Sequence, residues 1–215
     1  MIVDERMLQY IRSLDRCESP LIREIKQQAQ SSRVPIIRQE TAGLLRVLLC
    51  MTKPEQILEV GTAVGFSALL MSEYIEAGAK ITTIENYEKR IPIARENFKK
   101  AGKEDVITLL EGDAAEVMKT LSPGYDFIFM DAAKGQYIHF LPEVMRLLKV
   151  GGTLVSDNVL QDGDVVESRY AVTRRNRTIH SRMRDYLWEL THMDSFQTIV
   201  LPIGDGVTVS TRVAE

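Results

Sequence analysis

Between residues 56 and 156, short apolar runs alternate with longer amphipathic stretches, and this alternation constrains the fold more than any other feature. The apolar runs span residues 56–60, 80–84, 106–110, 125–130 and 153–156. Helical periodicity fills the intervals at 67–77, 89–101, 115–121 and 138–148, and Gly151-Gly152 predicts a turn into the fifth run. Strands separated by helices pair in parallel, with helices on both faces of the sheet. The pattern therefore predicts an α/β fold built on a doubly wound, mostly parallel sheet.

The two ends of the chain depart from this rhythm. Residues 1–53 show helical periodicity, with a helix-start signal at Ser19-Pro20 and a strongly apolar segment at 41–51. Near the C-terminus, 196–201 and 207–212 are strand-like, and the five residues between them are too few for a crossover helix. We therefore expect an antiparallel C-terminal hairpin that completes a seven-stranded sheet. Residues 1–215 are expected to form one domain with a helical appendage at 1–53.

Composition excludes several classes of protein. A chain of 215 residues that is 45% hydrophobic and 27% charged can build a core, and its apolar runs are too short to span a membrane. Asp4, Glu5 and Arg6 stand where a signal peptide needs apolar residues, which predicts a cytoplasmic protein. Cys17 and Cys50 are expected to be free thiols, and the three histidines lie too far from them for a zinc site.

An acidic residue stands at the end of each of the five apolar runs. These residues are Glu59, Glu85, Asp113, Asp131 and Asp157. Ligands of open α/β sheets bind outside the carboxyl ends of the strands, so the five carboxylates should converge on one rim. Any single one could instead cap a helix, but five clustered like charges are unfavourable unless a ligand or cation offsets them.

A glycine-rich turn, Gly61-Thr62-Ala63-Val64-Gly65, follows the first run. It lets the backbone approach a ligand before the next helix begins, and Glu85 follows Gly61 at the distance expected of a carboxylate that binds ribose hydroxyls. The turn does not match the G-x-G-x-x-G pattern and the chain has no P-loop, which disfavours dinucleotide or ATP binding.

In combination these motifs resemble the class I S-adenosylmethionine-dependent methyltransferases, and more narrowly the cation-dependent O-methyltransferases of the catechol and caffeoyl-CoA type. The resemblance covers nearly the whole chain and rests on six segments: 60–67, Ile84-Glu85, 112–114, 129–134, 157–159 and 204–206. Within this family the chain is similar to the bacterial tRNA 5-hydroxyuridine methyltransferases, which make 5-methoxyuridine at the wobble position. The resemblance implies a class I, Rossmann-like methyltransferase fold.

The resemblance also implies roles for individual residues. S-adenosylmethionine would be held by Glu59, Gly61, Thr62 and Ser67 at its methionine end, by Glu85 at the ribose and by Asp113 and Ala114 at the adenine, with Asp131 close by. Asp131, Asp157 and Asn158 match the ligands of a divalent cation, usually Mg²⁺. Lys134 matches the proposed general base.

These residue types suit that chemistry. Mg²⁺ prefers oxygen ligands, and a bound cation lowers the pKa of a substrate hydroxyl. Lys134, partly desolvated near the cation, could accept the proton before in-line transfer of the methyl group from the sulfonium. Two plainer interpretations stay open, namely that Lys134 is a surface lysine starting a helix and that Asp157-Asn158 forms a turn. Calcium and manganese accept similar ligands, so the cation's identity is not predicted.

A cation site of this kind asks the substrate for two neighbouring oxygens, which both catechols and 5-hydroxyuridine possess. A basic stretch favours RNA, because six arginines and no acid occupy 169–184. We predict an RNA-binding surface, with the tRNA anticodon loop as substrate, formed by Arg33, Arg38, Arg169, Arg174, Arg175 and Arg177. Tyr137, Tyr170 and Phe66 could stack on bases but equally suit structural roles. The basic run could also be a solvated face or a dimer contact.

The sequence thus predicts a tRNA 5-hydroxyuridine O-methyltransferase that uses S-adenosylmethionine and a divalent cation. The alternatives are a small-molecule catechol or phenylpropanoid O-methyltransferase and a non-catalytic cofactor- or RNA-binding protein. The family is often dimeric, and the apolar N-terminal helices are candidates for a homodimer interface.

Overall fold

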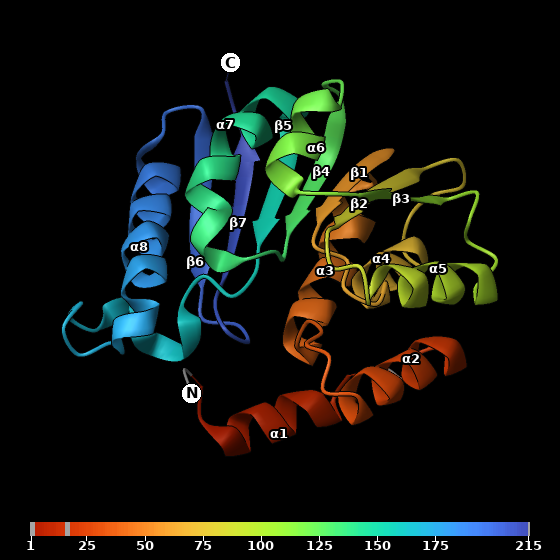
Figure 1. Ribbon diagram of the computed structural model, residues 1–215, viewed down its shortest axis with the longest axis horizontal. Helices are drawn as coiled ribbons and strands as arrows, with labels where there is room; N and C mark the ends of the chain where they lie inside the picture. The colour runs from red at the N-terminus through yellow and green to blue at the C-terminus, as the bar shows by residue number, and fades with distance from the viewer. Residues whose placement is uncertain (1–2, 16–17, 215) are drawn as a thin grey trace.

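The computed structural model describes residues 3–15 and 18–214. Three helices open the chain: α1 (Glu5–Ser13), α2 (Pro20–Ser31) and α3 (Gln39–Thr52). Asp4 caps α1 by accepting from the backbone amides of Arg6 and Met7, and Ser19 caps α2 directly before Pro20. Figure 1 shows α1 and α2 along one side of the molecule and α3 running from them toward the sheet.

Seven strands form one sheet in the order β3-β2-β1-β4-β5-β7-β6. The five parallel strands are β1 (Gln56–Val60), β2 (Lys80–Glu85), β3 (Ile107–Glu111), β4 (Tyr125–Met130) and β5 (Leu148–Ser156). The last two, β6 (Phe196–Leu201) and β7 (Val207–Arg212), are antiparallel to each other, and β7 is antiparallel to β5. The predicted doubly wound sheet and the C-terminal hairpin are confirmed.

Helices cover both faces of the sheet. They are α4 (Phe66–Ser72), α5 (Ile91–Lys100), α6 (Ala114–Thr120), α7 (Tyr137–Leu147) and α8 (Arg177–His192), with short 3₁₀ turns η1 (Lys134–Gln136), η2 (Gln161–Val166) and η3 (Arg174–Asn176). One hydrophobic core packs helices α2, α3, α4 and α5 against one face of the sheet, through residues such as Leu45, Leu69 and Phe98. The other joins α6, α7 and α8 to the opposite face through residues such as Leu141 and Tyr186.

The main boundary error of the sequence analysis concerns β5. Gly151-Gly152 does not form a turn before the strand, because β5 begins at Leu148 and runs through both glycines. Tyr125 pairs with Leu148 and Phe127 with Thr153, so the glycines sit at a register shift in the ladder. Glycine commonly marks such irregularities within strands. Helix α4 is also shorter than the predicted 67–77, ending at Ser72.

The strand order reverses between β1 and β4, which places the ligand-binding position of this fold at their carboxyl ends. There the amide of Asp131 donates to the carbonyl of Val60 at 3.0 Å, so the ends of the two strands stay joined. Within the described residues, no helix is long and apolar enough to cross a membrane. Cys50 is an exposed free thiol, and Cys17 lies outside the described residues.

Candidate active site

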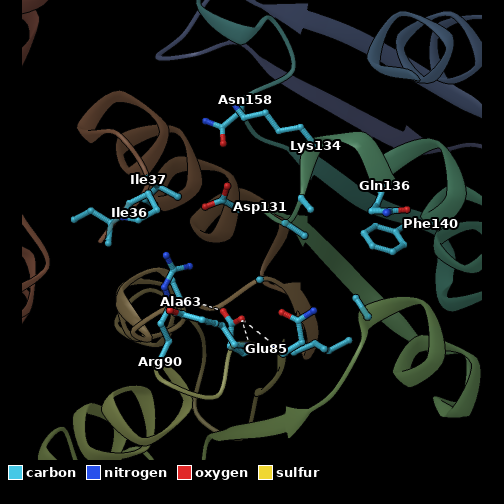
Figure 2. Close-up of a pocket in the computed structure, with 18 of the residues that line it drawn as sticks. Ile36, Ile37, Ala63, Glu85, Arg90, Asp131, Lys134, Gln136, Phe140 and Asn158 are labelled. Carbon is cyan, nitrogen blue, oxygen red and sulfur yellow. Dashed lines mark hydrogen bonds between the residues drawn. The ribbon is translucent and has the colours of Figure 1, made fainter. Parts of the chain in front are cut away.

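A cavity of about 730 Å³ opens at the carboxyl ends of β1, β2, β3 and β4. The predicted residues that line it are Gly61, Glu85, Asp113, Ala114, Asp131, Lys134, Asn158 and Arg38. The N-terminal segment 35–37 forms another wall. Figure 2 shows Asp131 in the middle of the pocket, with Lys134 and Asn158 toward one end and Glu85 toward the other. Of the five carboxylates predicted to share one rim, Glu85, Asp113 and Asp131 line this cavity, whereas Glu59 and Asp157 are buried behind it.

Gly61 lets β1 and β4 approach each other at the floor of this cavity. Its φ is +98°, and a Cβ placed on it would lie 2.4 Å from the carbonyl oxygen of Asp131. No side chain fits there, and the left-handed conformation also favours glycine. The glycine requirement at the turn is thus steric as well as conformational.

Glu85 is oriented by the backbone around it. Its carboxylate accepts from the amides of Ala63 at 2.8 Å, Tyr87 at 2.9 Å and Asn86 at 3.0 Å. A carboxylate has about four acceptor positions, so one remains for a ligand hydroxyl. At the next strand end, Asp113 caps α6 by accepting from the amide of Ala115 at 2.9 Å. Asp113 therefore caps the helix and lines the cavity at the same time.

Glu59, Thr62 and Ser67 lie behind the glycine turn and do not line the cavity. Glu59 is fully buried, its Oε2 accepts from the hydroxyl of Thr83 at 2.5 Å, and its Oε1 has no partner among the described residues. Burial raises the pKa of Glu59, although the nearby hydroxyls of Ser67, Thr83 and Thr62 act in the opposite direction. The Glu59 carboxyl therefore lies in the protein interior behind the turn and is not exposed to the cavity.

Asp131 and Asp157 form an acidic pair at the ends of adjacent strands. Burial raises the pKa of Asp131 well above its ordinary value, and the charges of Asp157 and Glu59 add to the effect. Burial also raises the pKa of Asp157 to about 6, although the amide of Asn158 donates to its Oδ1 at 2.8 Å. Two buried carboxylates with raised pKa values are poorly stable as anions without a positive charge between them.

The same residues fit a hard divalent cation. Oδ2 of Asp157 is buried without a partner among the described residues, and Asn158, held at a φ of +60°, lines the cavity beside it. Two carboxylates and one amide oxygen leave open positions for water or substrate oxygens. Within the described ranges, three or more His, Cys, Asp or Glu side chains nowhere gather into a metal-binding group, so the amide would be needed as a ligand.

Lys134 has a partner that the sequence analysis did not assign. Its Nζ lies 3.0 Å from Oδ2 of Asp205, in the loop between β6 and β7. Asp205 is 6% exposed, and its other oxygen accepts from the amide of Asp162. The only signal in the sequence was the Gly204-Asp205-Gly206 motif, which carries no indication that it faces Lys134.

Arg38 belongs to the same cluster. It donates to Oδ1 of Asp162 at 2.9 Å and to the carbonyl of Gly204 at 3.2 Å, and it lies 3.8 Å from Oδ1 of Asp205. Arg38 thus ties the start of α3 to two loops at the cavity rim. Of the predicted RNA-binding arginines, Arg38 alone has ion-pair partners among the described residues.

The basic stretch divides into two kinds of arginine. Arg177, Arg182 and Arg184 donate to the backbone carbonyls of Val172, Gly135 and Val165. The side chains of Arg169, Arg174 and Arg175 are exposed and make no hydrogen bond or ion pair with the described residues, and the same holds for the side chain of Arg33. Because Gly135 follows Lys134, the contact from Arg182 places α8 against the cavity rim.

The aromatic candidates for base stacking divide in the same way. Tyr137 and Phe66 are buried in the core, whereas Tyr170 is 84% exposed and lies under the guanidinium of Arg177, 5.8 Å from the ring centre. Only Tyr170 is placed where a base could reach it.

Comparison with known proteins agrees with the fold and the cavity. Residues 12–213 match the model of the O-methyltransferase family. Caffeoyl-CoA O-methyltransferase 2 of Populus trichocarpa is 33% identical over 183 residues, covering 79% of this chain and 71% of the relative. The corresponding enzyme of Stellaria longipes is 29% identical and covers 99% of this chain and 92% of its own.

Solved structures show the same architecture. The S-adenosylhomocysteine-bound methyltransferase of Podospora anserina superimposes with a TM-score of 0.87 at 26% identity, covering 98% of this chain and 95% of its own. A Staphylococcus aureus structure, provisionally assigned as a caffeoyl-CoA O-methyltransferase, gives 0.86 at 30% identity and covers 97% and 98%. The fold is that of the class I methyltransferases. The chain belongs to the O-methyltransferase family.

Proposed function

We propose that this protein transfers the methyl group of S-adenosylmethionine to a hydroxyl oxygen, using a divalent cation held by Asp131, Asp157 and Asn158. The observation that carries the proposal is the carboxylate pair at the ends of β4 and β5: Asp131 lines the cavity, Asp157 is buried beside it with Oδ2 unpartnered among the described residues, and both pKa values are raised. A bound cation would offset this repulsion and lower the pKa of the substrate hydroxyl.

The residues of the chain divide the remaining work. Glu85 would accept from the ribose hydroxyls, Asp113 and Ala114 would flank the adenine, and the turn at Gly61 would admit the methionine end of the cofactor. S-adenosylmethionine held there would supply the methyl group to the substrate oxygen, with S-adenosylhomocysteine as the second product. We assign the neutral amine of Lys134 as the acceptor of the hydroxyl proton, and Asp205, 3.0 Å from Nζ, would pair with the ammonium that forms.

For the substrate, we propose the 5-hydroxyl of 5-hydroxyuridine at the tRNA wobble position. Its support is the set of exposed arginines without partners, Arg169, Arg174 and Arg175, on a segment that leads into α8 beside the cavity rim. Exposed arginines bind phosphates, and a loop-exposed base can be drawn into a pocket. Arg33 would extend this surface. Arg38 and Arg177 would contribute to RNA binding by fixing the loops to which they donate hydrogen bonds.

A small-molecule catechol or phenylpropanoid is the second candidate. The curated relatives are named as caffeoyl-CoA O-methyltransferases, which favours this substrate class over RNA. The cation site suits both classes, because each offers two neighbouring oxygens. The basic stretch is the feature that the small-molecule reaction does not require.

Methyl transfer from labelled S-adenosylmethionine distinguishes the two candidates. The chain is supplied with Mg²⁺ and offered tRNA containing 5-hydroxyuridine, the same tRNA with unmodified uridine, and a simple catechol. We expect label only in the hydroxylated tRNA, with the rate lost in EDTA and strongly reduced in Arg174→Glu/Arg175→Glu. Label in the catechol alone would establish the small-molecule enzyme, and full activity in EDTA would refute the cation site.

A further inference from the structure

Tyr137 places its hydroxyl between the two strand ends that carry the acidic pair. The side chain is fully buried, and its hydroxyl oxygen lies 3.1 Å from the carbonyl oxygen of Met130 and 3.1 Å from that of Asp157. Met130 is the last residue of β4 and directly precedes Asp131. One hydroxyl proton is therefore shared between the backbone of both proposed cation-binding strands.

This contact lies where the sheet ladder stops. Met130 pairs with Ser156 at the end of the β4–β5 register, and the amide of Asp157 donates to the carbonyl of Met130 at 2.9 Å. The register of the two strands ends there, and Asn158 adopts a left-handed conformation. The Tyr137 hydroxyl is the next contact that holds the two strand ends together.

We infer that Tyr137 is a positioning residue that sets the spacing of Asp131 from Asp157 and Asn158 for the divalent cation. This inference rests on the cation site of the proposed function. Mg²⁺ and Mn²⁺ require closely defined oxygen positions. Substitution of a residue that orients the metal ligands typically weakens metal binding ten- to a hundred-fold. The side chain itself is fully buried and does not line the cavity.

The chain supplies a matched control in Tyr186. Its ring packs edge-on against Tyr137 with centroids 5.5 Å apart, and it is equally buried. Its hydroxyl bonds to the side chain of Ser156 at 2.6 Å, rather than to the carbonyls beside Asp131 and Asp157. Tyr137→Phe and Tyr186→Phe each remove one buried, hydrogen-bonded hydroxyl, but only the first removes hydrogen bonds that join the backbone of β4 to that of Asp157.

The test measures Mn²⁺ binding to the full chain by electron paramagnetic resonance, alongside the affinity for S-adenosylhomocysteine and the thermal midpoint in EDTA. For Tyr137→Phe we expect Mn²⁺ affinity about ten-fold or more weaker, with S-adenosylhomocysteine affinity close to wild type. For Tyr186→Phe we expect wild-type Mn²⁺ affinity with a comparable fall in thermal midpoint.

Two results would overturn the positioning role while leaving the cation site intact. These are equal Mn²⁺ affinity in Tyr137→Phe and wild type, and an equal loss in both variants. A Tyr137→Phe chain that no longer bound S-adenosylhomocysteine would show that the hydroxyl supports the whole fold, which also overturns the inference. A wild-type chain that fails to bind Mn²⁺ would refute the proposed cation site, and the inference with it.

Discussion

At the scale of single residues, the candidate active site contains carboxylates whose environments differ. Glu85 accepts from three backbone amides, whereas Asp131 and Asp157 lie at neighbouring strand ends and Oδ2 of Asp157 has no partner among the described residues. The first arrangement suits a neutral polar ligand and the second suits a cation. All three residues occupy equivalent positions in the sequence pattern. The difference between their environments therefore comes from the structure around each strand end.

The raised pKa of Asp157 predicts a pH dependence of stability in the metal-free chain. A carboxyl whose pKa is higher in the folded than in the unfolded state loses stabilisation as pH rises between the two values, here from 3.8 to about 6. Asp157→Asn should therefore stabilise the protein in EDTA at pH 8, by on the order of 2–3 kcal/mol, and much less at pH 4. Urea unfolding at the two pH values measures this.

Asp162 is the control for that measurement. The hydrogen bond from Arg38 lowers the pKa of Asp162, so Asp162→Asn should reduce stability at pH 8. A destabilised Asp157→Asn chain at pH 8 would contradict the account of the acidic pair.

Lys134→Ala tests the assignment of the base. Loss of a general base typically lowers turnover by about a hundred-fold or more, and the affinity for S-adenosylhomocysteine should change little. Lys149→Ala is a suitable control, because Lys149 pairs with Asp126 at 2.7 Å at the opposite end of the strands. Turnover that stays normal in Lys134→Ala would remove the lysine from the reaction.

At the scale of elements, the turn between β1 and α4 determines how closely β1 and β4 approach. Gly61 and Gly78 have nearly the same φ, +98° and +97°, but only Gly61 faces another backbone, while nothing lies within 4 Å of a Cβ on Gly78. The two glycines therefore separate the cost of the left-handed conformation from the cost of the clash.

Gly61→Ala should destabilise the protein more than Gly78→Ala and should also abolish cofactor binding. Gly78→Ala bears only the conformational cost, about 1–2 kcal/mol. Denaturant unfolding and S-adenosylhomocysteine titration of both variants test this. Equal losses of stability would mean that the strand ends can separate to admit a methyl group.

At the scale of the whole molecule, charge and apolar surface are distributed unevenly. The net charge is −3, yet the exposed arginines gather on the segment leading into α8. Apolar side chains are exposed on or directly after α1 and α3, among them Met7, Leu14, Val47 and Met51. Of these, Leu14 and Val47 line a separate groove between the two helices. A homodimer at this face stays a prediction, which sedimentation analysis can test.

If the arginines bind phosphates, RNA affinity should depend on salt through them. Each phosphate contact to a single-stranded region contributes roughly 0.7 to the slope of log K against log salt, so Arg174→Ala/Arg175→Ala should reduce the slope by roughly 1.4. Lys99→Ala/Lys100→Ala removes the same charge from α5, at the other side of the sheet (Figure 1). Equal slopes for both double variants would assign the arginines to a solvated surface.

Much of this architecture follows from the sequence itself. The seven strands, the antiparallel hairpin and the rim of acidic side chains are local properties, because strand and helix periodicities are expressed over a few residues. Each acid directly follows an apolar run, so its place at a strand end needs no knowledge of distant contacts. The glycine-rich turn likewise indicates, from the sequence alone, that the backbone approaches another group closely at this point.

The tertiary structure determines which groups the side chains of the site contact. Lys134 meets Asp205 across 71 positions of sequence, and Tyr137 meets the carbonyl of Asp157 across 20. Such contacts depend on which strands become neighbours and how loops from different strands meet at one edge, which periodicity does not encode. The division of the arginines into exposed and backbone-bound groups also arises only once α8 packs on η1. Residue types and strand ends are written locally, whereas the geometry of the site comes from elements that meet only in the folded chain.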